Sequence, residues 1–346
     1  MYNFTITYNL DDSRIIPFLL EDNRASIYHH PAWLKAVTKT FNHKGFYLLL
    51  EDDHNNITGL YPFVFLNSRI TGKRIVSLPF STYCEPLLPK DKIKEAVSFL
   101  INTFGIESRI DLRTLIDYSD ELNEFSHSED YVTHFLDLKE NLQKTFDSFH
   151  PRSVRGSIRR SEKNHLTIDY GNSESDLQVF YNLEVILRKR LSLPPLPITF
   201  FKNIYNELKP FGLVCIPIVK KDNIPIAAGF ILNFKKTYYL EYAASDKKFL
   251  CFYPNHKLYW EIITLAQNNG ATEVDFGRTS LDNESLCVFK KKWDARINYI
   301  YNSVHPKRSI IKERQGVLKK YVMKLNTFLP TTVLKIEGKV IYQHLD

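Results

Sequence analysis

Two stretches of the chain repeat the same order of apolar runs and short polar turns. In the first stretch, an apolar run at 46–51 is followed by a polar turn at 52–56 and a second apolar run at 57–65. A third run at 74–78 precedes residues 90–104, whose apolar positions recur at helical spacing. The pattern predicts three strands joined by tight turns, followed by a helix.

The second stretch has strand-like runs at 213–219 and 225–234 around a polar turn at 220–223. A third strand-like run at 237–244 and a helical stretch at 254–268 follow. The repeated order predicts a degenerate duplication in an α/β (α+β) fold, with each half a mixed twisted sheet flanked by helices. One large mixed α/β domain is the alternative.

We expect three parts along the chain. An N-terminal domain spans 1–145, and a C-terminal domain at 146–305 bears the active site. Residues 306–346 form a basic helical extension, because 307–324 hold seven Lys or Arg residues against one acid, with apolar residues at helical spacing. Such a helix can lie on an anionic membrane surface or pack its apolar stripe on the protein.

Length and composition indicate an ordinary globular protein. The chain has 346 residues, 44% of them hydrophobic and 25% charged, which suffices for two domains. No apolar stretch reaches the roughly 18–20 residues that span a bilayer, and the N-terminus lacks the pattern of a secretory signal. The four cysteines are scattered, without the spacing of a metal site or disulfide framework. We therefore expect a cytoplasmic protein without metal, which can work at the inner membrane surface.

The net charge of +7 permits anionic partners, and one basic cluster is dense enough to bind them. Its members are Arg152, Arg155, Arg159, Arg160 and Lys163. In a helix, all of these except Arg160 fall on one face. Guanidinium groups can hold phosphate oxygens bidentately, so the cluster predicts an anion-binding helix. A solvated face paired with acids elsewhere is the alternative.

Polar residues also mark the ends of predicted elements in the second half. Asp275 and Arg278 flank a Phe-Gly pair after a strand, where they can hold a substrate or each other. Glu241 interrupts an apolar strand, either as a desolvated base or as an exposed strand-edge residue. Together these positions predict a binding cleft, to which we also assign Tyr242 and Asn255.

A basic run follows Phe289 and ends before Trp293. An ammonium such as that of Lys290, placed near a carbonyl under attack, stabilises the developing oxyanion, often the largest contribution to acyl transfer. A solubilising surface run at 290–292 is the alternative. Cys84 has no histidine near it in the local sequence, which favours a core or rim residue over a nucleophile.

The order of these features resembles the Fem-type peptidoglycan-bridge aminoacyltransferases and their relatives, which are built from two acyltransferase (GNAT-type) domains. The likeness spans roughly residues 28–295 and includes the strand at 238–245 with the helix that follows it, the segment from Asp275 to Arg278 and the Phe289-Lys290 pair. Family members also have an Arg-rich helix that opens the second domain, which the basic cluster matches. Two segments depart from the family pattern: Trp293-Asp294 replaces Trp-Gly, and Cys84-Glu85-Pro86 replaces a glycine-containing continuation.

The resemblance implies two tandem GNAT-type domains and an N-acylation, in which an acceptor amine attacks an activated acyl carbonyl. It implies a catalytic role for Lys290, with Asp275 and Glu241 as further candidates. The implied substrate-binding residues are Arg152, Arg155, Arg159, Arg160, Lys163, Tyr242, Asn255, Arg278 and Phe289. The acceptor would be a small-molecule or lipid-linked amine of a cell-envelope or glycan precursor.

The implied acyl donor is an aminoacyl-tRNA or an acyl-CoA, without a permanently bound cofactor and without a role for DNA. The sequence lacks the usual coenzyme A pyrophosphate loop, a Walker A motif and GxGxxG. Two other functions stay open: an acyl-CoA-dependent N-acyltransferase acting on an amino sugar or amino acid, and a non-catalytic phosphate- or RNA-binding relative. Peripheral contact with an anionic membrane is a further expectation.

Overall fold

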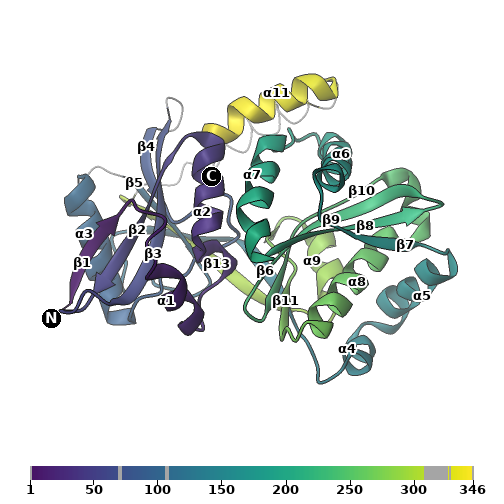
Figure 1. The fold of residues 1–346 in the computed structure, drawn as a ribbon, viewed down its shortest axis with the longest axis horizontal. Helices are drawn as coiled ribbons and strands as arrows, with labels where there is room; N and C mark the ends of the chain where they lie inside the picture. The colour runs from purple at the N-terminus through teal and green to yellow at the C-terminus, as the bar shows by residue number, and fades with distance from the viewer. Residues whose placement is uncertain (1, 69–71, 106–108, 308–325, 327–328, 345–346) are drawn as a thin grey trace. The chain divides into compact units, whose positions relative to one another are not determined.

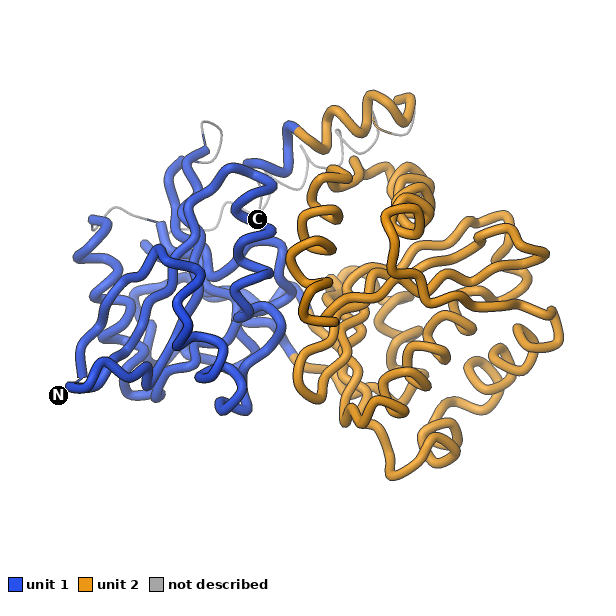
Figure 2. Tube along the Cα trace, in the orientation of Figure 1, with its two compact units in different colours: residues 1–131, 299–312, 340–346 blue, residues 132–298, 313–339 orange. Residues whose placement is uncertain are grey.

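The computed structural model describes residues 2–68, 72–105, 109–307, 326 and 329–344. The chain forms two compact units (Figures 1 and 2): unit 1 comprises 1–131, 299–312 and 340–346, and unit 2 comprises 132–298 and 313–339. The extension expected at 306–346 is thus shared between the units. Almost all of its basic stretch, at 308–325, lies outside the described residues.

Unit 1 holds a mixed sheet in the strand order β1-β2-β3-β4-β5-β13. The strands are β1 (Asn3–Thr7), β2 (Lys44–Glu51), β3 (Ile57–Ser68), β4 (Gly72–Val76), β5 (Arg109–Thr114) and β13 (Arg296–His305). Strands β4 and β5 are parallel, whereas the other neighbours are antiparallel. Helix α3 (Ile93–Phe104) makes the crossover that a parallel pair requires.

Unit 2 repeats this arrangement in the order β7-β8-β9-β10-β11-β6. The strands are β7 (Thr167–Gly171), β8 (Val214–Lys221), β9 (Ile224–Phe234), β10 (Thr237–Ser245), β11 (Glu273–Asp275) and β6 (Ser126–Asp137). Again one pair, β10 and β11, is parallel, and helix α8 (Pro254–Asn268) connects it. The matching strand order and directions confirm the duplicated α/β fold expected from the sequence.

Helices flank both sheets (Figure 1). Unit 1 has α1 (Ile15–Glu21) and α2 (Pro31–Phe41) ahead of its β2–β3 hairpin. Unit 2 has α4 (Leu142–Ser148), a π-helical turn (Pro151–Arg155), α5 (Gly156–Lys163), α6 (Glu174–Arg190), α7 (Ile198–Leu208) and α9 (Glu284–Lys291). A short strand, β12 (Thr279–Ser280), and helix α11 (Thr331–Ile341) complete the elements used below.

The boundary between the units falls between residues 131 and 132, within β6. The sequence pattern placed it near residue 145, which lies inside α4 of unit 2. Strand pairing explains the difference, because Phe135 to Asp137 already pair with β11 of unit 2. In the same way, Tyr301 to His305 pair with β5 and so belong to unit 1. The local sequence predicts a strand but does not predict which other strand it pairs with.

The indole of Trp293 is fully buried and belongs to a hydrophobic core cluster of unit 2. Its ring centroid lies 5.2 Å from that of Phe149, 5.4 Å from Tyr259 and 5.8 Å from His256. These neighbours come from the end of α4 and from α8, and Phe289 of α9 joins them at 6.2 Å. The cluster therefore holds α9 against α8.

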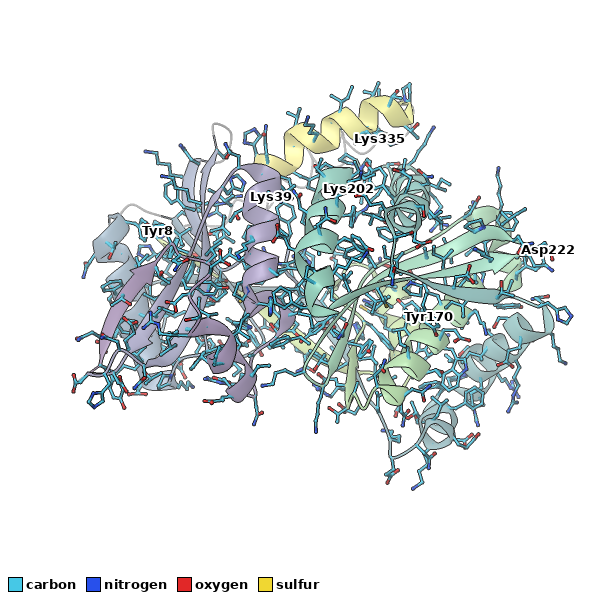
Figure 3. All side chains as sticks on the ribbon, viewed as in Figure 1. Tyr8, Lys39, Tyr170, Lys202, Asp222 and Lys335 are labelled. Carbon is cyan, nitrogen blue, oxygen red and sulfur yellow. The ribbon has the colours of Figure 1, made fainter. Side chains whose placement is uncertain are left out.

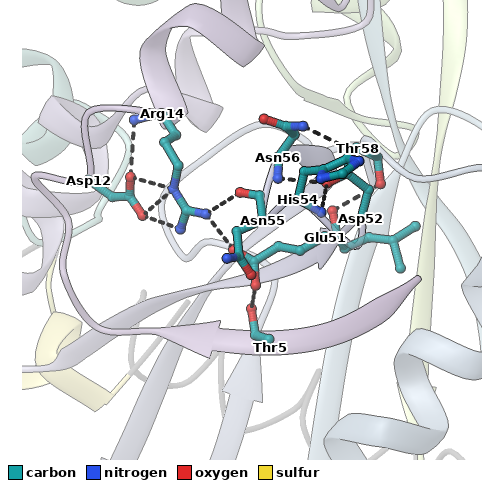
Figure 4. Close-up of polar contacts among 10 residues, drawn as sticks. Thr5, Asp12, Arg14, Glu51, Asp52, His54, Asn55, Asn56 and Thr58 are labelled. Carbon is teal, nitrogen blue, oxygen red and sulfur yellow. Dashed lines mark hydrogen bonds and ion pairs between the residues drawn. The ribbon is translucent and has the colours of Figure 1, made fainter. Parts of the chain in front are cut away.

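In unit 1, Arg14 binds polar groups of the β2–β3 hairpin (Figure 4). Its guanidinium lies 2.7 Å from the Asp12 carboxylate and 2.6 Å from that of Glu51, and it donates to the Asn55 carbonyl at 2.6 Å. Hydrogen bonding to Arg14 lowers the pKa of Asp12. The arginine thus ties the segment before α1 to the hairpin turn.

Replacing Arg14 with methionine is expected to lower the free energy of unfolding at neutral pH by about 1 kcal/mol, a value limited by the 40% exposure of this side chain. The pKa of Asp12 is lower in the folded protein than its ordinary value of 3.8. The stabilisation that Asp12 gives the folded state is therefore fully present above pH 3.8 and is lost as the pH falls below that value. Urea titrations of both proteins at neutral and acid pH test this. A difference that stayed constant on acidification would contradict the assignment.

Candidate functional site

Lys290 is a buried lysine near the end of α9, with only 3% of the residue exposed. Its ammonium Nζ donates to the Gly277 carbonyl at 2.7 Å and to Oγ1 of Thr279 at 2.8 Å. Burial lowers its pKa to about 8, although the charge of Asp275 opposes the shift. Lys291 is exposed, so a solubilising surface run describes Lys291 but not Lys290.

Asp275 ends β11 and shapes the turn that receives Lys290. The carboxylate is 1% exposed and accepts from the Thr133 hydroxyl at 2.5 Å and from the Gly277 backbone N–H at 2.8 Å. Gly277 has φ +73°, and a Cβ there would lie 3.2 Å from the Leu240 carbonyl, so glycine suits this turn. This geometry fits a positioning role for Asp275, and its catalytic assignment stays a prediction.

Glu241 sits where the pairing of β10 with β9 shifts register, between Leu240 and Tyr242. A bulge of this kind re-aims a side chain, and such bulges are common beside active sites. The Tyr242 ring packs 5.1 Å from that of Phe201, and burial raises its pKa well above the ordinary value. Arg278 is exposed, in contrast to the buried Asp275. The roles of Glu241, Tyr242 and Arg278 remain predictions.

A cavity of about 430 Å³ opens at the N-terminal ends of α8 and α9. Strand β10 pairs with β11 over Thr237 to Tyr239 and then continues beyond it, and Ser245 from this continuation lines the cavity. Two predicted residues, Asn255 and Phe289, also line it. Lys290 directly follows Phe289 on α9, but it is not among the residues that line the cavity.

The basic cluster lies on the π-helical turn and α5, with apolar Val154 and Ile158 buried on the opposite side. Arg160 donates to the Tyr253 hydroxyl at 3.0 Å, and Tyr253 directly precedes α8. Arg159 lies over the Phe146 ring at 5.6 Å. The structure therefore places one end of the cluster near the start of α8, where Asn255 lines the cavity.

Part of the basic cluster is paired with an acid. Arg155 forms an ion pair with Asp147 at 3.2 Å, as the solvated-face alternative anticipated for each member. Arg152, Arg159 and Lys163 remain exposed. Paired and exposed members coexist, so anion binding by the cluster stays a prediction.

Glu184 and His134 are among the buried polar residues that the sequence analysis did not identify. Glu184 of α6 is 1% exposed and pairs with Arg188 at 2.5 Å, a pair that its i,i+4 spacing could have suggested. His134 of β6 is fully buried, and neither ring nitrogen has a hydrogen-bond partner in the described part of the chain. Burial, followed by the nearby charge of Lys290, lowers the pKa of His134 to about 4. Within an apolar strand run, this histidine had no distinguishing signal.

Comparisons with known proteins agree with this architecture. A family model described as an acetyltransferase (GNAT) domain matches residues 148–290. The Lipid II:glycine glycyltransferase of Staphylococcus saprophyticus is 25% identical, over 58% of this chain and 66% of that protein. The crystal structure of FemX superposes with a TM-score of 0.69 at 17% identity, covering 87% of this chain and 96% of that one. A tandem GNAT protein from the clavulanic acid biosynthesis pathway gives 0.53 at 8% identity, covering 88% and 98%.

The chain is similar to the FemAB-like GNAT-type acyltransferases, and its residues 148–290 match a GNAT acetyltransferase domain. This confirms the family resemblance seen in the sequence and the tandem GNAT-type fold. This FemAB-like chain spans 66% of the length of its S. saprophyticus relative. Within the described residues, no helix is both long and apolar enough to cross a bilayer, and no group of three or more potential ligands is placed to hold a metal ion.

Proposed function

We propose that this FemAB-like protein transfers an aminoacyl or acyl group to an amine of a cell-wall precursor. The observation that supports this most directly is the buried Lys290 ammonium on α9, whose preceding residue, Phe289, lines a cavity together with Asn255. The names of the curated relatives, lipid II glycyltransferases, support a cell-wall acceptor that is lipid-linked. We place the reaction at the inner membrane surface, where such an acceptor would be met.

In this proposal, the acceptor amine attacks the donor carbonyl, a C–N bond forms, and the C–O or C–S bond to the donor breaks. The amine proton leaves with solvent or with the departing hydroxyl or thiol. Binding both reactants in one orientation can lower the barrier by on the order of 7 kcal/mol or more. Lys290, protonated at neutral pH, would stabilise the tetrahedral oxyanion from a site with little water. Glu241 remains the candidate base.

The donor decides between two versions of this function. Aminoacyl-tRNA is the donor we favour, because the relatives are named glycyltransferases. Acyl-CoA, with an amino sugar or amino acid as acceptor, is the second candidate, favoured by the match to an acetyltransferase domain. The third candidate, a non-catalytic RNA- or phosphate-binding relative, needs no donor.

Mass spectrometry of the acceptor after incubation with each donor separates the candidates. A mass increase of lipid II by one aminoacyl residue, dependent on charged tRNA, is the expected result. Acetylation of an amino sugar by acetyl-CoA would move the assignment to the second candidate. Salt-dependent RNA binding without turnover from any donor would favour the third.

The basic cluster is proposed to hold an anionic part of the acceptor. Replacing Arg152 and Arg159 together with alanine is expected to raise the acceptor KM at least tenfold with little change in kcat, since both exposed guanidiniums would bind remote from the reacting carbonyl. Removing two charges from the exposed β9–β10 turn, with Lys235→Ala and Lys236→Ala, is the matched control. If both double variants raised the acceptor KM equally, the effect would come from the net charge of the protein and not from the basic cluster.

A further inference from the structure

Helix α11 has one face packed on unit 2 and another face exposed. Leu334 is fully buried, and a Cβ at Gly338, one turn later, would collide with the Pro195 carbonyl oxygen, so that face lies directly on protein backbone. Val333, Ile336 and Val340 are 42%, 66% and 50% exposed. Their spacing of three and four residues places them in one stripe, away from the buried face.

Such a stripe is unusual for a surface helix. Single exposed apolar side chains are common on soluble proteins, but adjacent ones mark a surface that contacts something else. Three of the eleven residues of α11 are large, apolar and exposed. The helix therefore has the two-sided character of an interfacial helix, with a protein face and a free apolar face.

The surrounding charge indicates which surface would cover the stripe. Lys335, which is labelled in Figure 3, and Lys339 lie along one edge of the stripe. The Lys335 ammonium sits 5.4 Å from the Tyr181 ring. The chain leading to α11 has seven basic residues and one acid at 307–324, within a net charge of +7. Apolar residues bordered by cations complement a bilayer that contains anionic lipid.

We propose that α11 is a membrane-docking helix, which inserts Val333, Ile336 and Val340 into the headgroup–acyl boundary of an anionic bilayer. Lys339 then faces the phosphates at the level of the headgroups. The proposal does not depend on the transfer reaction, because no residue of the stripe belongs to the cavity or to the Lys290 site.

Co-sedimentation of the full chain with vesicles tests the proposal. The vesicles contain phosphatidylcholine alone or with phosphatidylglycerol, and no acceptor. Binding is expected for the anionic vesicles, and Ile336→Asp is expected to weaken it at least tenfold, because the change places a charge at the centre of the stripe. Ile224→Asp is the matched control, since Ile224 is also an exposed isoleucine, at 54%, at the β8–β9 turn.

Each outcome decides the proposal. Loss of binding with Ile336→Asp but not with Ile224→Asp supports it, provided that both variants unfold at the wild-type temperature. Equal loss with both variants, unchanged binding, or no binding by the wild type overturns it. Gel filtration shows whether Ile336→Asp instead abolishes a dimer, which would make the stripe an interface between two copies. Activity on a soluble acceptor should be the same in all three proteins, which separates this test from that of the proposed function.

Discussion

Replacing Lys290 with methionine is expected to lower kcat by about 10²-fold or more, because the change removes the ammonium proposed to stabilise the oxyanion while keeping an unbranched side chain. Lys291→Met is the control, since it removes an exposed ammonium one residue further along α9. Single-turnover rates with bound donor measure the effect on the chemical step. A rate unchanged by Lys290→Met would assign this lysine to the fold alone.

The pH dependence provides a second measure of Lys290. Burial lowers its pKa to about 8, so the charged form that stabilises an oxyanion is present below this pH and is lost as the pH rises through it. We therefore expect kcat of the wild type to fall on the alkaline side of about pH 8. The Asp275 charge raises the pKa of Lys290, so Asp275→Asn should move this fall to lower pH. A profile that is unaffected by Asp275→Asn would contradict the coupling.

Replacing Trp293 with alanine is expected to lower the free energy of unfolding by about 3–5 kcal/mol, the usual cost of deleting a fully buried large aromatic side chain. The lost indole packs against Phe149, Tyr259 and Phe289, so α9 should loosen and kcat should fall as well. Denaturant titration followed by circular dichroism measures the stability.

Two variants calibrate the Trp293 result. Trp293→Phe keeps most of the volume and should cost less than the alanine change. Tyr8→Ala removes an aromatic residue that is 59% exposed (Figure 3), and should change stability by roughly 0.5 kcal/mol or less. If Trp293→Ala were no worse than Tyr8→Ala, the aromatic cluster around Trp293 would not stabilise unit 2.

Much of the fold was predictable because its signals are local. Alternating apolar residues and polar turns located the hairpins of both units, and β2–β3 and β8–β9 lie where that pattern placed them. The parallel pairs β4–β5 and β10–β11 follow from a helix between two strands. The pairing of β6 with β11 and of β13 with β5 could not be predicted. In each pair the two strands are distant in sequence, and neither β6 nor β13 differs in pattern from its neighbours.

For the candidate site, the sequence predicted which residues take part but not which of them are buried. The motif order pointed to Phe289 and Asn255, which line one cavity. The family's Phe-Lys pair pointed to Lys290, but the local pattern did not show that Lys290 is buried and Lys291 exposed, because burial depends on the helical phase of α9 against the turn at Gly277. His134 was missed because a polar residue in an apolar run gives no indication of the groups that will surround it, whereas the i,i+4 spacing of Glu184 and Arg188 could have indicated their ion pair.

By itself, the sequence determined the order of the elements, the duplication, the family resemblance and the density of positive charge, since each of these depends on residues that are close together in the chain. The tertiary structure alone decided which lysine is buried, which strands complete each sheet and which face of α11 remains exposed. These depend on contacts between residues far apart in the chain. Burial and pKa values are set by such contacts, and no local pattern encodes them.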